Sequence, residues 1–159
     1  MTWTLSTPDK VMLPADGLTK PDLVEHYQLV ADAMLPWLVR RPLTLQRFPN
    51  GIAAKGFMQK NVSDHFPASI ERYEVDRQEG GVTTYPILTT ADDIGYLANQ
   101  GTITFHAWTS TIDHPSQPDW FLLDLDPAEG DTAGVRQVTS HAGTVLARFG
   151  LEALVVATG

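Results

Sequence analysis

Two apolar stretches near the end of the sequence, separated by a helical stretch, constrain the fold most strongly. Residues 120–125 and 151–157 are short and almost wholly apolar, which is typical of buried strands. Residues 131–149 between them predict a helix that ends at Gly150. A strand–helix–strand unit of this kind predicts a mixed fold, α/β or α+β.

The first long helix has clear signals at both ends. Thr19 is a capping residue type, and Pro21 suits the first turn of a helix. Apolar residues then recur at helical spacing as far as Leu38. Pro36 and Pro42 are predicted to bound the end of this helix.

Strand and turn signals fill most of the remaining chain. A short helix is predicted over 90–100, with Thr90 and Asp93 as a capping pair and Gly101 as its stop. Residues 62–81 are polar and broken, so they predict a surface segment. Strands are predicted over 42–48, about 56–61, 83–88 and 102–108.

Charge divides the sequence into two unlike halves. Residues 1–77 hold nine of the eleven Lys and Arg together with nine Asp or Glu, so they are neutral. Residues 78–159 hold two bases and ten acids, and this difference accounts for the whole net charge of -8. An acidic protein is a poor nonspecific binder of nucleic acid, but a neutral half can still carry a basic face. A solvated acidic surface is the simpler interpretation of the charge alone.

The clearest chemical signature is the pair Asp124 and Asp126 at the end of the first apolar stretch. Alternation along a strand points both carboxylates to one face. Two carboxylates held close together repel each other, and a divalent cation relieves that repulsion. Mg²⁺ or Mn²⁺ fits oxygen ligands best, and a two-metal site of this kind serves nucleotidyl transfer. A strand end with two solvated acids is the alternative.

Basic and aromatic residues in the first half suggest a second site. Lys20 stands at a helix start, where a phosphate can bind, and Lys10 lies a short turn away. Phe57 lies in a stretch where aromatic and basic residues interleave, as they do on base-stacking surfaces. The alternatives are that the two lysines are simply exposed and that Phe57 faces the core. His106 could contact a phosphate or a metal, and the alternative for it is a structural role.

These segments, taken together and in order, resemble the start of the polymerase domain of bacterial ligase D, a member of the archaeo-eukaryotic primase superfamily. The resemblance covers nearly the whole chain. Members of the ligase D polymerase family add nucleotides, often ribonucleotides, at DNA ends during non-homologous end joining, and related stand-alone proteins fill short gaps. The matching segments are Pro8–Pro14, Thr19–Lys20, Arg41–Thr44, Arg47–Gly51, Phe57–Asn61, Thr84–Ile87, Phe105–His106 and Asp124–Pro127.

The resemblance implies a metal-dependent nucleotidyltransferase with Mn²⁺ or Mg²⁺ as its cofactor. Asp124 and Asp126 match two catalytic metal ligands of the family. Lys10 and Lys20 match the pair that grips the 5′-phosphate of a DNA end or gap. Nucleoside triphosphates, a repair ligase and an end-binding protein are the other expected partners, in a cytoplasmic, nucleoid-associated protein with no membrane partner.

Four further residues receive roles from the same resemblance. Phe57 matches an aromatic residue that packs on DNA, and Met58 stands where the family has a second aromatic. Methionine has no π face, so stacking there is expected to be weaker. Arg47 matches an arginine near the primer end, and His106 matches a histidine beside the incoming nucleotide.

The resemblance also implies an organisation for the chain. Residues 1–159 match the N-terminal portion of a primase-polymerase domain, with 1–80 as the DNA-end-binding part and 81–159 as the start of the catalytic sheet. In the family, a lysine-containing segment that holds the triphosphate and a third catalytic aspartate follow the point that matches Gly159. The primase-polymerase-like fold is therefore expected to be incomplete at its C-terminus.

Two alternative functions remain open from the sequence. The first is a binding module that grips a 5′-phosphorylated end without doing chemistry. The second is a phosphatase that uses Asp124 as its nucleophile. Such phosphatases usually carry Thr or Val shortly after the second aspartate, whereas Asp126 is followed by Pro127.

Overall fold

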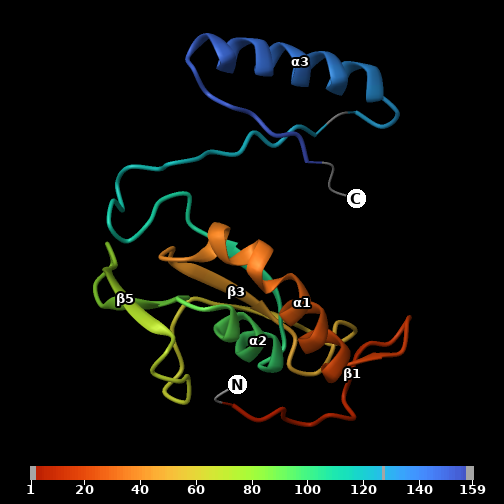
Figure 1. Cartoon of the computed structure of the whole chain (residues 1–159), viewed down its shortest axis with the longest axis vertical. Coiled ribbons are helices and arrows are strands. Elements are labelled where there is room, and N and C mark those ends of the chain that lie inside the picture. Colours follow the sequence, from red (N-terminus) through yellow and green to blue (C-terminus); the bar gives the residue numbers. More distant parts are fainter. Residues whose placement is uncertain (1–2, 127, 157–159) are drawn as a thin grey trace. The chain divides into compact units, whose positions relative to one another are not determined.

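A computed structural model describes residues 3–126 and 128–156 of the chain (Figure 1). It divides into two compact units, Met1–Phe121 and Leu122–Gly159. The first unit combines two helices with three small antiparallel sheets, and the second contains one helix. The predicted mixed α and β class is confirmed.

The strands of the first unit form two hairpins and one three-stranded sheet. The hairpins pair β1 (Val11–Leu13) with β2 (Leu18–Thr19), and β5 (Glu71–Asp76) with β6 (Val82–Ile87). The three-stranded sheet has the order β4-β3-β7, with β3 in the centre. Its strands are β3 (Leu43–Arg47), β4 (Phe57–Gln59) and β7 (Thr102–Ala107).

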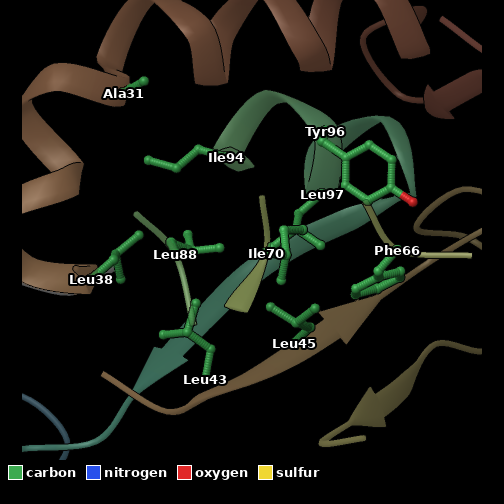
Figure 2. Packing of buried hydrophobic residues seen from close by; sticks show 10 residues of the cluster. All are labelled: Ala31, Leu38, Leu43, Leu45, Phe66, Ile70, Leu88, Ile94, Tyr96 and Leu97. Carbon is green, nitrogen blue, oxygen red and sulfur yellow. The ribbon is translucent and has the colours of Figure 1, made fainter. Parts of the chain in front are cut away.

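Two helices cover one face of this sheet. Helices α1 (Lys20–Leu38) and α2 (Ala91–Asn99) pack against each other (Figure 1). Figure 2 shows Leu43 and Leu45 of β3 pointing toward side chains of both helices. The buried cluster consists of Ala31, Leu38, Leu43, Leu45, Phe66, Ile70, Leu88, Ile94, Tyr96 and Leu97.

The helix starts follow the predicted capping chemistry. At the start of α1, the backbone N–H of Thr19 donates to Asp22 Oδ2 at 2.7 Å. At the start of α2, the backbone N–H and the hydroxyl of Thr90 both donate to Asp93 Oδ2 at 2.9 Å. These carboxylates also lie in the first turn, where the helix dipole stabilises negative charge.

Helix α1 ends at Leu38, between the two prolines predicted to bound its end, and Pro36 itself lies inside the last turn. A proline removes one backbone hydrogen bond and crowds the preceding turn. Here the remaining helix is less than one turn, and the N–H of Val39 still bonds to Leu35 O at 2.8 Å. Burial of Leu38 in the core also favours the continued helix.

The prediction of a polar surface segment over 62–81 is wrong in part. This stretch contains β5, whose register with β6 runs from Glu71 opposite Ile87 to Asp76 opposite Val82. Phe66 and Ile70, just before β5, are almost wholly buried in the core. Phe66 and Ile70 are isolated apolar residues in a polar sequence, so no periodic pattern marks them as buried.

The second unit contains the predicted helix but not the predicted strands beside it. Helix α3 (Thr132–Arg148) begins after Asp131, whose Oδ1 accepts from the N–H of Gly134 at 2.8 Å. Residues 120–126 and 151–156 are not strands, and residue 157 lies outside the described residues. A strand needs a hydrogen-bonded neighbour, and no strand within the described residues pairs with either stretch.

No helix among residues 3–126 and 128–156 is long and apolar enough to cross a bilayer.

Replacement of Leu45 by alanine tests the position of the core. Leu45 is fully buried in the core cluster, so we expect Leu45→Ala to lower the free energy of unfolding by about 2–5 kcal/mol. Leu29→Ala is the matched control, because Leu29 is 82% exposed, and we expect a change within about 0.5 kcal/mol. Urea unfolding of the two variants measures both values, and equal losses would contradict this core.

Candidate DNA-end and metal sites

The first hairpin brings the two predicted phosphate-binding lysines together. Lys10 directly precedes β1, and Lys20 directly follows β2 as the first residue of α1. The backbone N–H of Lys20 donates to the carbonyl of Lys10 at 2.8 Å. Ten residues of sequence therefore separate two cations that the backbone holds side by side.

Each lysine is held by one hydrogen bond from its ammonium group. Lys10 Nζ donates to the carbonyl of Pro49 at 2.8 Å, and Lys20 Nζ donates to Ser6 Oγ at 3.0 Å. Lys20 is only 6% exposed. Its burial, followed by the positive charges of Lys10 and Arg47, lowers the pKa of its ammonium group.

Arg47 is a third cation in this region, and its charge acts on Lys20. It ends β3, where the register with β7 shifts between Gln46 and Arg47, and such irregularities re-aim side chains. Its guanidinium donates to Gln100 O from Nε at 3.0 Å and from Nη2 at 2.7 Å. Nη1 donates to Gln59 Oε1 at 2.5 Å. Burial lowers the pKa of the guanidinium, which remains charged at physiological pH.

Among the described residues, no acidic side chain forms an ion pair with these three cations. Within residues 3–126 and 128–156, the two ion pairs are Arg40–Asp113 and Arg41–Asp119, and neither includes one of the three cations. We call Lys10, Lys20 and Arg47 the cation cluster. Neutral oxygens satisfy its hydrogen bonds but not its charge, so an anion is the partner that the electrostatics favour.

An exposed aromatic side chain lies beside the cation cluster on the edge strand β4. The guanidinium carbon of Arg47 lies 5.6 Å from the ring centre of Phe57, directly across the ladder. Phe57 is 48% exposed and Met58 is 51% exposed. The expected alternative for Phe57, a core-facing aromatic, is therefore wrong. The exposed ring of Phe57 offers a flat apolar surface on which a nucleic-acid base can pack, whereas Met58, the next residue of the strand, points to the opposite face of the sheet.

His106 lies on β7, on the face of the sheet that turns away from the core. It pairs across the ladder with Thr44, whereas the neighbouring pair, Leu45 with Phe105, faces the core. His106 is exposed. Met58 pairs with Gln46 on the other side of β3 and shares this outer face.

The acidic pair belongs to the second unit. Asp124 and Asp126 line one hollow of about 350 Å³ together with residues at the start of α3. Asp131 also lines it, but its Oδ1 caps α3. Among the described residues, no group of three or more His, Cys, Asp or Glu side chains could hold a metal ion.

The donor chemistry of the pair fits a hard divalent cation, although it supplies only part of a coordination shell. Both side chains are exposed and carry oxygen donors, which Mg²⁺ and Mn²⁺ prefer. Mg²⁺ takes six ligands and usually keeps several waters and substrate phosphates. The two carboxylates therefore suit a site in which phosphate oxygens and water provide the remaining ligands.

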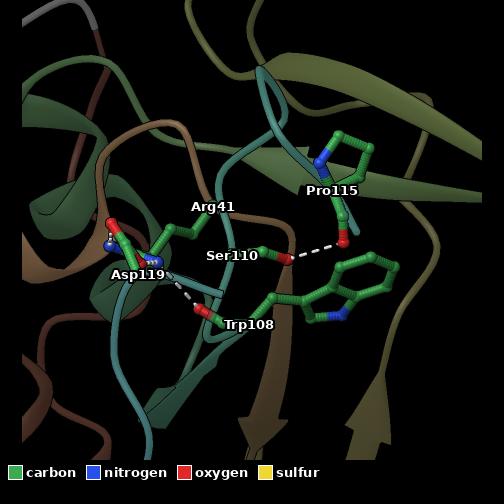
Figure 3. A network of polar contacts seen from close by, with 5 residues as sticks. All are labelled: Arg41, Trp108, Ser110, Pro115 and Asp119. Carbon is green, nitrogen blue, oxygen red and sulfur yellow. Dashed lines mark hydrogen bonds and ion pairs between the residues drawn. The ribbon is translucent and has the colours of Figure 1, made fainter. Parts of the chain in front are cut away.

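A polar network fixes the segment that leads toward the acidic pair. Arg41 donates to both carboxylate oxygens of Asp119, at 2.8 and 2.6 Å, and to Trp108 O at 3.4 Å (Figure 3). Figure 3 also shows Ser110 donating to Pro115 O, at 3.0 Å, within the same loop. The hydrogen bonds from Arg41 lower the pKa of the Asp119 carboxyl. Asp119 stands five residues before Asp124.

A sequence profile of the LigD primase-polymerase domain matches residues 19–159. The chain belongs to the LigD primase-polymerase family. The resemblance noted in the sequence is thereby confirmed.

Curated members of the LigD family align along most of this chain. A multifunctional non-homologous end joining protein LigD from Mycolicibacterium smegmatis is 35% identical over 80% of the chain and 17% of its own length. The multifunctional non-homologous end joining DNA repair protein LigD of Mycobacterium tuberculosis is 33% identical over 98% of the chain and 22% of its own length. The chain thus spans about a fifth of these relatives.

A solved LigD structure shares the fold. The polymerase domain from Mycobacterium tuberculosis ligase D, in complex with DNA, matches 94% of this chain with a TM-score of 0.80 and 32% identity. The match covers 55% of that chain. The predicted primase-polymerase-like fold is therefore confirmed.

Several residues of the site escaped the sequence analysis. The carbonyls of Pro49 and Gln100 hold Lys10 and Arg47, and backbone groups carry no residue-type signal. Ser6 holds Lys20 from a segment without any recognisable motif. The Arg41–Asp119 pair spans 78 residues of sequence, so only the fold brings it together.

The buried ammonium of Lys20 predicts a change of stability with pH. Its pKa is lower in the folded protein than the ordinary 10.5, so the unfolded chain binds more protons between these two values. The charged ammonium group therefore destabilises the folded protein most at pH values below its folded pKa, and this destabilisation disappears as pH rises toward 10.5.

We expect the stability of the native protein, relative to Lys20→Met, to increase as pH rises from the lowered pKa of Lys20 toward 10.5. Denaturant unfolding of both proteins across this range measures the difference. Tyr27 and Tyr96, whose pKa values are raised by burial, titrate in both proteins and cancel in the comparison. A constant difference would contradict the lowered pKa.

Proposed function

We propose that the protein binds 5′-phosphorylated DNA ends or short gaps and adds nucleotides there, in non-homologous end joining or gap repair. The observation that carries this proposal is the cation cluster, which is partly buried and has no acidic partner among the described residues. A terminal phosphate is a compact dianion, and it would neutralise charges that the protein leaves uncompensated.

The surroundings of the cluster favour DNA over a free phosphate. Phe57 is an exposed aromatic side chain next to Arg47, and a base adjoining the terminal phosphate would pack on it. Lys20 also stands at the N-terminus of α1, where the helix dipole favours an anion. Phosphate binding and base packing would together fix the end of a strand rather than its middle.

The acidic pair supports nucleotidyl transfer. We propose that Asp124 and Asp126 hold Mn²⁺ or Mg²⁺, with the triphosphate of the incoming nucleotide among the remaining ligands. A metal bound there would lower the pKa of the attacking hydroxyl and stabilise the charge on the phosphate that leaves. Arg47 would lie near the primer end, and His106 beside the nucleotide.

The relatives suggest the biological setting. Their names describe multifunctional proteins of non-homologous end joining, and the matched solved domain was obtained in complex with DNA. We propose the same pathway for this chain, with a repair ligase and an end-binding protein as partners. Membership of a polymerase family also favours nucleotidyl transfer over the phosphatase alternative.

One observation favours a second candidate, binding of the end without chemistry. Asp124 and Asp126 gather no third acidic or histidine ligand within the described residues. The cation cluster needs no metal, so recognition of the 5′-phosphate can operate when nucleotide addition does not. The two experiments below separate these functions.

Recognition of the 5′-phosphate predicts a preference that depends on Lys20. We expect the native protein to bind a gapped duplex with a 5′-phosphate more tightly than the same duplex with a 5′-hydroxyl, and we expect added salt to weaken binding. A charge-assisted hydrogen bond contributes about 1.5–3 kcal/mol, so Lys20→Ala should remove about a tenfold to a hundredfold preference. Fluorescence anisotropy with both duplexes measures the ratio of Kd values.

The exposed basic residue Lys55 provides the matched control for this binding experiment. Lys55→Ala removes the same charge from a site outside the cation cluster. It should weaken binding to both duplexes equally and leave their ratio unchanged. Equal affinity of the native protein for the two duplexes would argue against the proposed end recognition.

Nucleotide addition predicts dependence on the acidic pair. With Mn²⁺ and all nucleotides, we expect extension of a primer at a 5′-phosphorylated gap, and Asp126→Asn should abolish it because a metal ligand loses its charge. Glu129→Gln is the control, since it removes one nearby exposed carboxylate outside the pair. Extension that survives in Asp126→Asn would contradict the metal role, whereas no extension with intact 5′-phosphate preference would support the binding-only function.

A further inference from the structure

We propose that Ser6 and Asn99 are positioning residues that set the ammonium group of Lys20 for recognition of the 5′-phosphate. This inference rests on the proposed function. Neither residue is part of the cation cluster, and neither need touch the phosphate. Their role is to decide where one charge of the cluster lies and which of its hydrogens remain available.

Four hydrogen bonds connect Lys20 to the end of α2. Lys20 Nζ lies 3.0 Å from Ser6 Oγ, and Ser6 Oγ lies 3.2 Å from Asn99 Oδ1. The backbone N–H of Ser6 also donates to Asn99 Oδ1, at 3.0 Å. Asn99 Nδ2 donates to the carbonyl of Thr4 at 3.0 Å. Asn99 is 2% exposed, so the network begins from a fixed side chain.

The direction of each hydrogen bond follows from the chemistry of the groups. The carbonyl of Thr4 can only accept, so the amide nitrogen of Asn99 faces it and Oδ1 faces Ser6. The hydroxyl of Ser6 has one hydrogen, which it donates to Oδ1. Its lone pairs then face Lys20, and Ser6 Oγ acts as the acceptor for the ammonium group.

This arrangement leaves the ammonium group with hydrogens to offer. A lysine has three N–H donors, and Ser6 is the only side-chain acceptor that Lys20 Nζ meets within the described residues. A carboxylate in the place of Ser6 would neutralise the charge and compete with an anion. A neutral hydroxyl fixes the ammonium group without neutralising it, which suits a site that must bind phosphate.

Gln100, the residue after Asn99, holds the side chain of Arg47 in place. The carbonyl of Gln100 accepts two hydrogen bonds from the guanidinium of Arg47, at 3.0 and 2.7 Å. Asn99, acting through Ser6, and the next residue, Gln100, therefore hold two of the three cations. The spacing of the cluster depends on this one short segment.

Removal of the Ser6 hydroxyl separates positioning from charge. Ser6→Ala keeps all three cations, so the slope of affinity against salt should stay unchanged. Loss of one hydrogen bond frees the ammonium group to move, and we expect the preference for 5′-phosphate over 5′-hydroxyl DNA to fall by about threefold to tenfold. Ser6 is exposed, so the variant should fold normally.

The experiment compares four proteins of residues 1–159 by fluorescence anisotropy: the native protein, Ser6→Ala, Ser6→Thr and Thr4→Ala. Ser6→Thr restores a hydroxyl and should recover the preference. Thr4→Ala removes a hydroxyl two residues away and keeps the carbonyl that Asn99 contacts, so it should leave the preference unchanged. This pattern would support the proposal.

The remaining outcomes overturn it in distinguishable ways. A native preference that Ser6→Ala leaves unchanged would refute the positioning role and leave the proposed end recognition intact. Equal losses in Ser6→Ala and Thr4→Ala, or no recovery in Ser6→Thr, would show that the segment matters and the Ser6 hydroxyl does not. A native protein without any preference would refute the proposed end recognition, and the inference with it.

Discussion

The close approach of two turns is the constraint on which the DNA-end site depends. The N–H of Phe48 donates to Gly101 O at 2.7 Å, where β3 leaves the sheet and β7 enters it. Gly101 has φ of +79°, and a Cβ there would lie 3.1 Å from Phe48 O and from the Cα of Pro49. Only glycine fits both the conformation and the space. The approach places the carbonyls of Pro49 and Gln100 where they hold Lys10 and Arg47.

The same arrangement concentrates positive charge at a cost to stability. Lys20 is 6% exposed and Arg47 is 8% exposed, and burial lowers the pKa of both groups. A fold selected only for stability would place a carboxylate between them or move them into solvent. Retention of neutral acceptors around three cations is instead the arrangement that an anion-binding site requires.

The sequence predicts the parts of this protein whose signals are local. The helix starts at Thr19 and Thr90 follow from capping chemistry, and the exposed Phe57 agrees with the predicted stacking surface. The resemblance to the family supplied the pairing of Lys10 with Lys20, which the hairpin then brings together. These inferences needed no knowledge of how distant segments meet.

The errors arise where distant contacts decide the structure. Ile70 is fully buried although its neighbours are polar. The roles of Ser6 and Asn99 depend on a contact across 93 residues, and the hydrogen bonds of Arg47 end on a backbone carbonyl. No spacing rule reports such contacts.

The two candidate sites differ in how far the described residues organise them. Hydrogen bonds to backbone carbonyls and to Ser6 hold the three cations in place, so the proposed phosphate site would be arranged before any ligand binds. Asp124 and Asp126 are exposed, and the apolar side chains around them, Leu122, Leu123 and Leu125, are exposed as well. Helix α3 buries none of its residues. Apolar surface left in water contributes no stability, so contacts within the described residues do little to fix the geometry of the acidic pair. Of the two steps of the proposed function, the binding of a DNA end is therefore the one whose residues the described part of the chain holds in place.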